Sequence, residues 1–185
     1  MLLQSGNRAK AYLQKLVRYE LLPNFVILLK SVDEKQETLN LNPEQMKTAY
    51  YNPREEEEET MHKAGINFAL ISASSCNEKQ VVETLAERPE EYIVFAGRDI
   101  LKEAFLANKK FIHIHPGKLP QYRGSTCPYY STIIERKWCC TAMIMQQEID
   151  CGEIITVKEF PLPSSGIDAT RIYDPHTRSE TLADV

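Results

Sequence analysis

The chain has 185 residues, of which 43% are hydrophobic and 26% are charged, and these values exclude a disordered chain. This length fits a single domain with a sizeable core. The net charge of −4 at pH 7 offers no electrostatic footprint for nucleic acid. No apolar run approaches the roughly 18 residues that span a bilayer. We therefore expect neither nucleic acid nor a membrane as a partner.

The five cysteines are odd in number, two of them are adjacent, and none lies in a C-x-x-C pair. Such a set fits reduced thiols in a cytoplasmic protein better than a disulfide framework. Cys127 and Cys151 lie in predicted loops, where a reactive thiol is one reading and inert packing is the favoured one. The first residues contain no long apolar segment, so we expect no secretory signal.

The N-terminal part predicts a strand, a helix and a second strand. A short strand is expected at Leu2 and Leu3, followed by a helix over residues 8–21 with apolar residues at helical spacing. Residues 25–29 form an apolar run of strand length, typical of a strand covered on both faces of a parallel sheet. This succession is the opening of a βαβ unit and predicts an α/β fold.

Residues 31–60 are polar and irregular, and residues 55–59 are five consecutive glutamates. The favoured interpretation is a solvated first turn of a helix, because acidic groups stabilise the positive end of the helix dipole. Binding of a cation or a basic partner is the alternative. We expect this helix to end at Gly65, a strand at residues 66–71, and a helix at residues 77–88 that Pro89 ends.

A buried strand at residues 92–96 ends at Gly97 and precedes a short helix at residues 98–106 and a strand at residues 111–115. In that last strand the side chains alternate, so His113 and His115 share one face. Pro116 and Gly117 end it. Gly97 and the histidines are therefore expected at one sheet edge. No GxGxxG or Walker pattern occurs, so we predict no dinucleotide or ATP site.

The C-terminal part predicts a helix at residues 128–134 and two strands at residues 141–147 and 154–160. The strands are expected to pair antiparallel around a turn that bears Asp150. Tyr129 and Tyr130 could stack on a ligand, although packing of the helix is favoured. Residues 168–185 look helical in part, with a break at Pro175. Because Val185 follows without a cap or tail, we expect the native protein to continue beyond it.

The segment HIHPGKLPQYRG at residues 113–124, with Asp150-Cys151-Gly152 downstream, resembles the folate-dependent formyltransferase family. That family includes methionyl-tRNA formyltransferase, glycinamide ribonucleotide transformylase and the sugar N-formyltransferases. Its pattern is Asn-x-His-Pro, Leu-Pro-x-Tyr-Arg-Gly and a later Asp-x-Gly, and the likeness covers residues 92–162. It implies a Rossmann-like, mostly parallel sheet flanked by helices, with an antiparallel strand pair near the C-terminus. Residues 1–185 would form one catalytic domain.

The resemblance implies formyl transfer from 10-formyltetrahydrofolate to a small-molecule amine. His115 matches the family histidine, which suits a general base or an oxyanion stabiliser near neutral pH. Asp150 matches the family aspartate, and a carboxylate there would orient the imidazole and raise its pKa. His113 stands where the family has asparagine. Neutral histidine can also donate one N–H to the oxyanion, but it is larger and titrates. Histidine at this position has three possible consequences. The protein could retain activity with an altered pH dependence, it could use another acceptor, or it could be a weakened enzyme.

The resemblance also implies binding residues. Those expected to bind the folate are Phe95, Ala96, Gly97, Ile149, Asp150 and Gly152. Those expected near the acceptor are Arg123 and Tyr122. Ordinary core packing is the alternative for Phe95, and bonding of loop carbonyls is the alternative for Arg123.

Three other functions stay open. Water could replace the amine, which gives a formyltetrahydrofolate hydrolase. The fold could bind folate without catalysis. A metal-dependent hydrolase could use the His-x-His pair with Asp150 as a third ligand. Among acceptors the acidic charge disfavours transfer RNA, and the N-terminal half gives no support for the purine-pathway substrate. An amino-sugar nucleotide remains by elimination. The oligomeric state is open, with a homodimer as one option.

Overall fold

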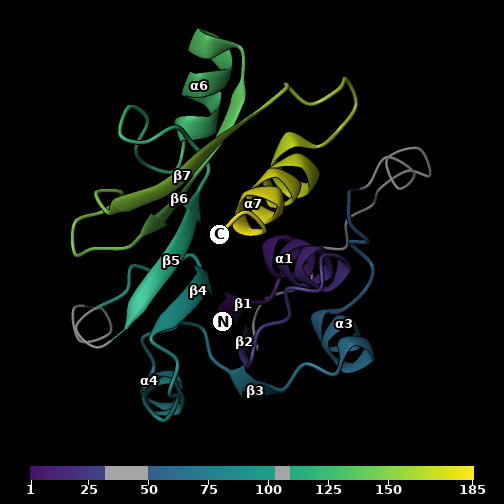
Figure 1. The fold of residues 1–185 in the computed structure, drawn as a ribbon, viewed down its shortest axis with the longest axis vertical. Coiled ribbons are helices and arrows are strands. Elements are labelled where there is room, and N and C mark those ends of the chain that lie inside the picture. The colour runs from purple at the N-terminus through teal and green to yellow at the C-terminus, as the bar shows by residue number, and fades with distance from the viewer. Residues whose placement is uncertain (32–49, 103–108) are drawn as a thin grey trace.

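In the described part of the chain, residues 1–31, 50–102 and 109–185, seven strands form one sheet in the order β3-β2-β1-β4-β5-β6-β7 (Figure 1). The structure is a computed structural model. The strands are β1 (Leu2–Gln4), β2 (Val26–Lys30), β3 (Phe68–Ser72), β4 (Tyr92–Ala96), β5 (Lys110–His115), β6 (Trp138–Ile144) and β7 (Glu153–Phe160). The helices are α1 (Asn7–Arg18), α3 (Glu57–Ala64), α4 (Lys79–Ala86), α6 (Cys127–Glu135) and α7 (Asp174–Leu182).

Five strands of the sheet run parallel, from β3 through β2, β1 and β4 to β5. Strands β6 and β7 then continue the sheet antiparallel, joined by the turn that bears Asp150. This arrangement confirms the predicted α/β class, a mostly parallel sheet with an antiparallel strand pair near the C-terminus. The parallel order also brings the carboxyl ends of β1, β4 and β5 together at one edge.

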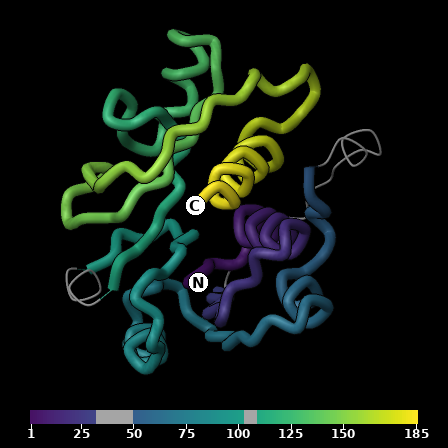
Figure 2. The backbone as a smooth tube through the Cα atoms, viewed as in Figure 1, coloured from purple at the N-terminus to yellow at the C-terminus, as the bar shows by residue number. Residues whose placement is uncertain are grey.

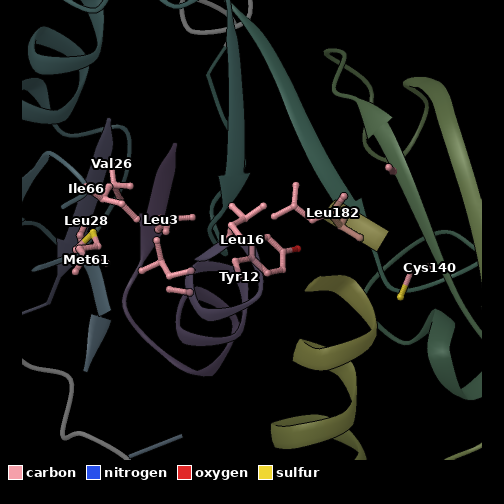
Figure 3. Packing of buried hydrophobic residues seen from close by; sticks show 14 of the residues in the cluster. Leu3, Tyr12, Leu16, Val26, Leu28, Met61, Ile66, Cys140 and Leu182 are labelled. Atoms are coloured by element: carbon pink, nitrogen blue, oxygen red, sulfur yellow. The ribbon is translucent and has the colours of Figure 1, made fainter. Parts of the chain in front are cut away.

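Alternation along the strands divides the core into two layers. Leu3 and Leu28 belong to the cluster that packs with α1, α3 and the C-terminal helix (Figure 3). Leu2, Ile27 and Leu29 point the other way and pack with α4. Strand β2 carries apolar side chains on both of its faces because each face packs against a layer of helices.

Helix α7 lies beside α1, although the two come from opposite ends of the chain (Figure 2). A buried ammonium group on α1, Lys15, bonds the carboxylate of Glu180 on α7. Further along, Lys158 of β7 contacts Asp184 at 2.7 Å. These contacts seat the last helix against the sheet, where its first turn reaches the edge formed by β4 and β5.

The glutamate run is not wholly solvated, which corrects one prediction. Helix α3 begins at Glu57 and ends before Gly65, whose φ of 67° lies in the left-handed region. Glu57 itself is fully buried and accepts hydrogen bonds from the Ser5 hydroxyl at 3.0 Å and the Gly6 amide at 2.7 Å. One carboxylate of the run therefore holds the loop between β1 and α1.

Two predicted helical segments also differ from the structure. Residues 98–102 are not helical, and the rest of the predicted helix, like residues 32–49 of the irregular stretch, lies outside the described residues. Pro175 does not break a helix but stands in the first turn of α7, where its missing N–H removes no intrahelical bond. A π-helical turn, Ala169–Tyr173, precedes it. Within the described ranges, no helix has the length and apolar character to cross a bilayer.

Candidate active site

A cleft of about 730 Å³ opens at the carboxyl edge of the sheet, where β1, β4 and β5 end. In open α/β sheets this edge is where ligands bind, because the chain turns there from strand to helix or loop. The volume is in the range of small-molecule sites. The residues implied by the family pattern that line it are Phe95, Ala96, Gly97, His113, His115, Ile149 and Asp150.

Strand β5 places the two imidazoles. Phe111 and Ile114 are fully buried on opposite faces of the sheet, in different core clusters. The alternation that puts Ile114 into the α7 layer directs His113 and His115 away from it and into the cleft. Beyond His115 the chain turns at Pro116 and Gly117, so the second imidazole stands at the end of the strand.

His115 is held at both ring nitrogens. Its Nδ1 lies 3.3 Å from Oδ1 of Asp150, and its Nε2 lies 2.8 Å from the carbonyl oxygen of Tyr122. The side chain is only 3% exposed. Burial lowers the pKa of His115, while the Tyr122 carbonyl and the Asp150 carboxylate act in the opposite direction and raise it. Because both partners are acceptors, protonated His115 satisfies both of them and neutral His115 satisfies one.

Asp150 connects two loops of the site. Its Oδ2 accepts a hydrogen bond from the Gly124 amide at 2.8 Å, while Oδ1 faces His115. Asp150 has a φ of 55°, so the turn between β6 and β7 points its carboxylate back toward the cleft. Gly152 makes this turn possible, since a Cβ added there would lie 1.9 Å from the Ile144 carbonyl oxygen. The glycine two residues after Asp150 is therefore required because a side chain there would collide with the backbone of β6.

Thr141 of β6 holds the loop after β5 by two hydrogen bonds. This buried hydroxyl donates to the Gly117 carbonyl at 2.6 Å and accepts from the Leu119 amide at 3.1 Å. Cys127 packs against the same loop, where a Cβ added at Gly117 would lie 2.9 Å from its Sγ. Burial raises the pKa of the Cys127 thiol to about 12, which agrees with an inert packing residue.

His113 is bound more loosely than His115. Its Nδ1 lies 3.4 Å from the Phe95 carbonyl oxygen, at the long limit of a hydrogen bond. Burial lowers the pKa of His113 to about 3, and the positive charges of Arg178 and Arg8 lower it further. The imidazole is therefore neutral near pH 7. The weak contact at Nδ1 leaves either tautomer accessible.

The opposite wall of the cleft is cationic, and the motif did not predict it. Arg8, Arg98, Arg171 and Arg178 all line the cleft. Arg8 donates to the Gly97 carbonyl at 3.3 Å, and its buried Nε has no hydrogen-bond partner among the described residues. The pKa of Arg8 falls to about 10, chiefly because Arg178 is near and secondly because of burial. Helix α1 begins here without an acidic residue in its first turn.

Three residues expected to bind ligands do not line the cleft. Arg123 is exposed outside it. Tyr122 contributes only its backbone carbonyl to His115, and its hydroxyl bonds Glu135. Gly152 lies behind the Asp150 turn. Of the two tyrosines on α6, Tyr129 lines the cleft and is 56% exposed, and Tyr130 does not line it.

In the described part of the chain, His113, His115 and Asp150 are not among the side chains placed to share a metal ion. Among the described residues, two sets of side chains have ligand atoms close enough to share an ion, and neither contains His113, His115 or Asp150. One set is Glu135, Cys139 and Glu159, whose two carboxylates already pair with Lys118. The other is Glu56, Glu57 and Glu58.

The sequence model of a formyl transferase domain matches residues 10–181 of the chain. The methionyl-tRNA formyltransferase of Sulfurimonas denitrificans is 32% identical over 95 residues, which cover 50% of this chain and 31% of that protein. That of Chloroflexus aurantiacus is 33% identical over 102 residues, covering 52% and 33%. The chain thus matches about a third of the length of these curated relatives.

Solved structures share the fold over nearly the whole chain. A phosphoribosylglycinamide formyltransferase from Streptococcus pneumoniae superposes with a TM-score of 0.61 at 17% identity, covering 98% of this chain and 89% of that one. A sugar N-formyltransferase from a Shewanella species gives 0.59 at 21% identity, covering 99% and 65%. A formyltetrahydrofolate deformylase from Pseudomonas syringae gives 0.64 at 14%, covering 99% and 57%. With the domain match over residues 10–181, the chain belongs to the formyl transferase family.

Proposed function

We propose that this protein transfers a formyl group from 10-formyltetrahydrofolate to the amine of an amino-sugar nucleotide. The observation that carries the proposal is the buried His115, held by Asp150 inside a cleft that Phe95, Ala96 and Gly97 also line. The reaction takes place in the cytoplasm, where the five free thiols of the chain would stay reduced.

The apolar part of the cleft fits the donor. Phe95, Ile100, Leu101 and Met143 line it and provide the hydrophobic surface that a flat heterocycle needs. Gly97 allows a tight strand end, since a Cβ there would lie 2.4 Å from the Phe95 ring. When bound, 10-formyltetrahydrofolate supplies a formyl carbon that an amine can attack.

His115 takes the proton that the attacking amine loses. With one proton on Nδ1, donating to Asp150, its Nε2 carries the lone pair that accepts a second. The imidazolium then donates to both Asp150 and the Tyr122 carbonyl, which stand 3.3 Å and 2.8 Å away. The oxygens that stabilise this cation are in place before the proton arrives.

His113 stabilises the negative charge that develops on the formyl oxygen. It does so as a neutral donor, with its proton on Nε2 and only the weak 3.4 Å contact to Phe95 lost at Nδ1. Its low pKa suits this role, because His113 does not compete for the proton that His115 accepts. The histidine thus replaces the donor that the family pattern supplies with an asparagine.

The cationic wall supports an acceptor that carries phosphate. The guanidinium of Arg8 lines the same cleft as the histidines and favours an anion there. The unpartnered Nε of Arg8 offers a donor that an oxyanion would satisfy. Arg123, which lies outside the cleft, is not needed for this contact. A diphosphate-linked amino sugar supplies the amine and the anion in one molecule.

A turnover assay with 10-formyltetrahydrofolate tests the proposal. The acceptors are a panel of amino-sugar nucleotides, with the free amino sugars as matched controls that lack the phosphates. We expect formylated sugar nucleotide and tetrahydrofolate in equal amounts, at a rate at least tenfold above the free sugars. Formate release that does not depend on an acceptor would instead show a hydrolase, and folate binding without turnover would show a binding protein.

A further inference from the structure

Arg178 is the most deeply buried cation near the two histidines. It comes from α7, far from the motif in sequence, and only 6% of its surface is exposed. Its Nε contacts the carboxylate of Asp174 at 2.9 Å, one turn earlier in the helix, and its Nη1 donates to the Ile114 carbonyl at 2.8 Å. A forked guanidinium with two such bonds has little freedom to move.

The carbonyl that Arg178 binds belongs to the residue between the two histidines. Phe111, two residues before His113, directs its carbonyl to β6, where it accepts from the Met145 amide at 2.7 Å. By alternation, Ile114 directs its carbonyl to the β4 side. The ladder between β4 and β5 ends with the pair Phe95 and His113. Arg178 therefore bonds a β5 carbonyl just beyond the last residue pair that β4 and β5 form.

The same guanidinium acts on both imidazoles through its charge. Arg178 lowers the pKa of His113, second only to burial, and also that of His115, where burial acts first and Asp150 opposes. The other groups that face this region are Arg8 from α1, Asp174 from α7, Asp150 from the β6–β7 turn and the thiol of Cys127 from α6. Cys127 is neutral, so Asp150 and Asp174 are the opposing charges.

We propose that Arg178 is a positioning residue of the transfer site, which holds the Ile114 carbonyl between His113 and His115 and places its positive charge near both imidazoles. The inference rests on the proposed function and extends it to a residue outside the motif. Asp174 contributes to the same role, since its carboxylate orients the guanidinium of Arg178 and offsets some of its positive charge.

Three variants separate this role from a structural one: Arg178→Met, Arg178→Lys and Asp174→Asn. Proton NMR titration follows the imidazole of His115 in each free protein, and steady-state assays follow the pH profile of formyl transfer. In Arg178→Met the lost charge raises the pKa of His115 and moves the acid limb of kcat to higher pH, by about one unit. We also expect kcat to fall about tenfold at pH 7 and KM for the donor to stay within twofold.

The two other variants have different expected signs. Arg178→Lys keeps the positive charge but loses the planar guanidinium that makes two directed hydrogen bonds. We therefore expect kcat to fall while the pKa of His115 is unchanged. Asp174→Asn removes the opposing charge, so the titration of His115 moves to lower pH. Opposite shifts in Arg178→Met and Asp174→Asn support the proposal. Unchanged titration of His115 in Asp174→Asn overturns it, even if Arg178→Met does not fold.

The titration is independent of turnover. Shifts of the expected sign in a protein that transfers no formyl group would support the coupling between Arg178 and His115 and refute the proposed function. Normal turnover with a pH profile that is the same in wild type, Arg178→Lys and Asp174→Asn would refute the role of Arg178 and leave the proposed function standing.

Discussion

The two walls of the cleft are built in different ways. One wall comes from consecutive segments, the end of β5 with its loop and the turn before β7, and it holds His113, His115 and Asp150. The other comes from the two ends of the chain, α1 and α7, and it holds Arg8 and Arg178. In the first wall backbone groups hold His115 and Asp150, and the second wall is dominated by buried positive charge.

This difference separates the chemistry from the choice of acceptor. In the proposed reaction, proton transfer and oxyanion stabilisation take place at the first wall. The second wall presents positive charge and the unpartnered Nε of Arg8, which suit the binding of an anionic group more than bond making. Substitutions in the first wall are therefore expected to lower kcat, and those in the second to raise KM or shift the pH profile.

The sharpest test of the first wall is His115→Ala. Loss of the proton acceptor is expected to lower kcat by about 10³-fold. His62→Ala is the matched control, because that imidazole is exposed on α3 and lies outside the cleft. Steady-state turnover measures the effect, with circular dichroism to show that the fold remains. Activity of His115→Ala within tenfold of wild type would exclude His115 as the base.

Asp150→Asn keeps the shape of the side chain, and its amide oxygen can still accept from Gly124. It removes the charge that stabilises protonated His115, so we expect kcat to fall about 10²-fold. Because Asp150 raises the pKa of His115, its loss lowers that pKa further. Neutral His115 then persists to lower pH, and the acid limb moves to lower pH. Glu148→Gln, a neighbouring exposed carboxylate in the cleft, should leave the pH–rate profile unchanged.

The role of His113 is tested by a pair of variants. His113→Asn retains an N–H donor and should keep kcat within about tenfold of wild type, whereas His113→Leu removes it and should lose about 10²-fold. The comparison is made at saturating donor and acceptor, so that binding does not contribute. Equal activity of the two variants would show that no donor is needed at this position.

The smallest effect is expected at the second wall. Arg8→Gln should raise KM for an amino-sugar nucleotide about tenfold through the loss of one charge-assisted contact, with kcat within twofold. Arg123→Gln is the control that decides between the motif and the structure, because Arg123 is exposed outside the cleft. If Arg123→Gln raises KM and Arg8→Gln does not, the acceptor binds elsewhere.

Much of the fold could be predicted because its strands are apolar, short and bounded by glycine or proline. The predictions at residues 92–96 and 154–160 nearly match β4 and β7. The predicted helix at residues 98–106 was wrong over its described part, because residues 98–102 instead contribute to the cleft and bond β1 and the segment before α4. The Arg98 amide donates to Gln4, and Asp99 accepts from the Cys76 amide. Such long-range bonds leave no local pattern.

The site divides in the same way. His113, His115 and Asp150 could be predicted to lie together because the segment at residues 113–124 and the later Asp-x-Gly carry them. Arg8 and Arg178 could not, since their place in the cleft depends on how α1 and α7 pack against the sheet. The spacing of Asp174 and Arg178, four residues apart, is the one available signal, but the predicted break at Pro175 lies between them. Read alone, that spacing indicates an ordinary surface ion pair, and only the burial of Arg178 shows otherwise.

The neutral state of His113 has a consequence for how the protein tolerates acid. Its pKa of about 3 in the folded protein lies far below the ordinary value near 6.5. Between these two values the unfolded chain binds a proton at His113 and the folded chain does not. Below pH 6.5 acidification therefore favours unfolding through this one residue. The charge arrangement that keeps the imidazole unprotonated also makes the native state sensitive to acid.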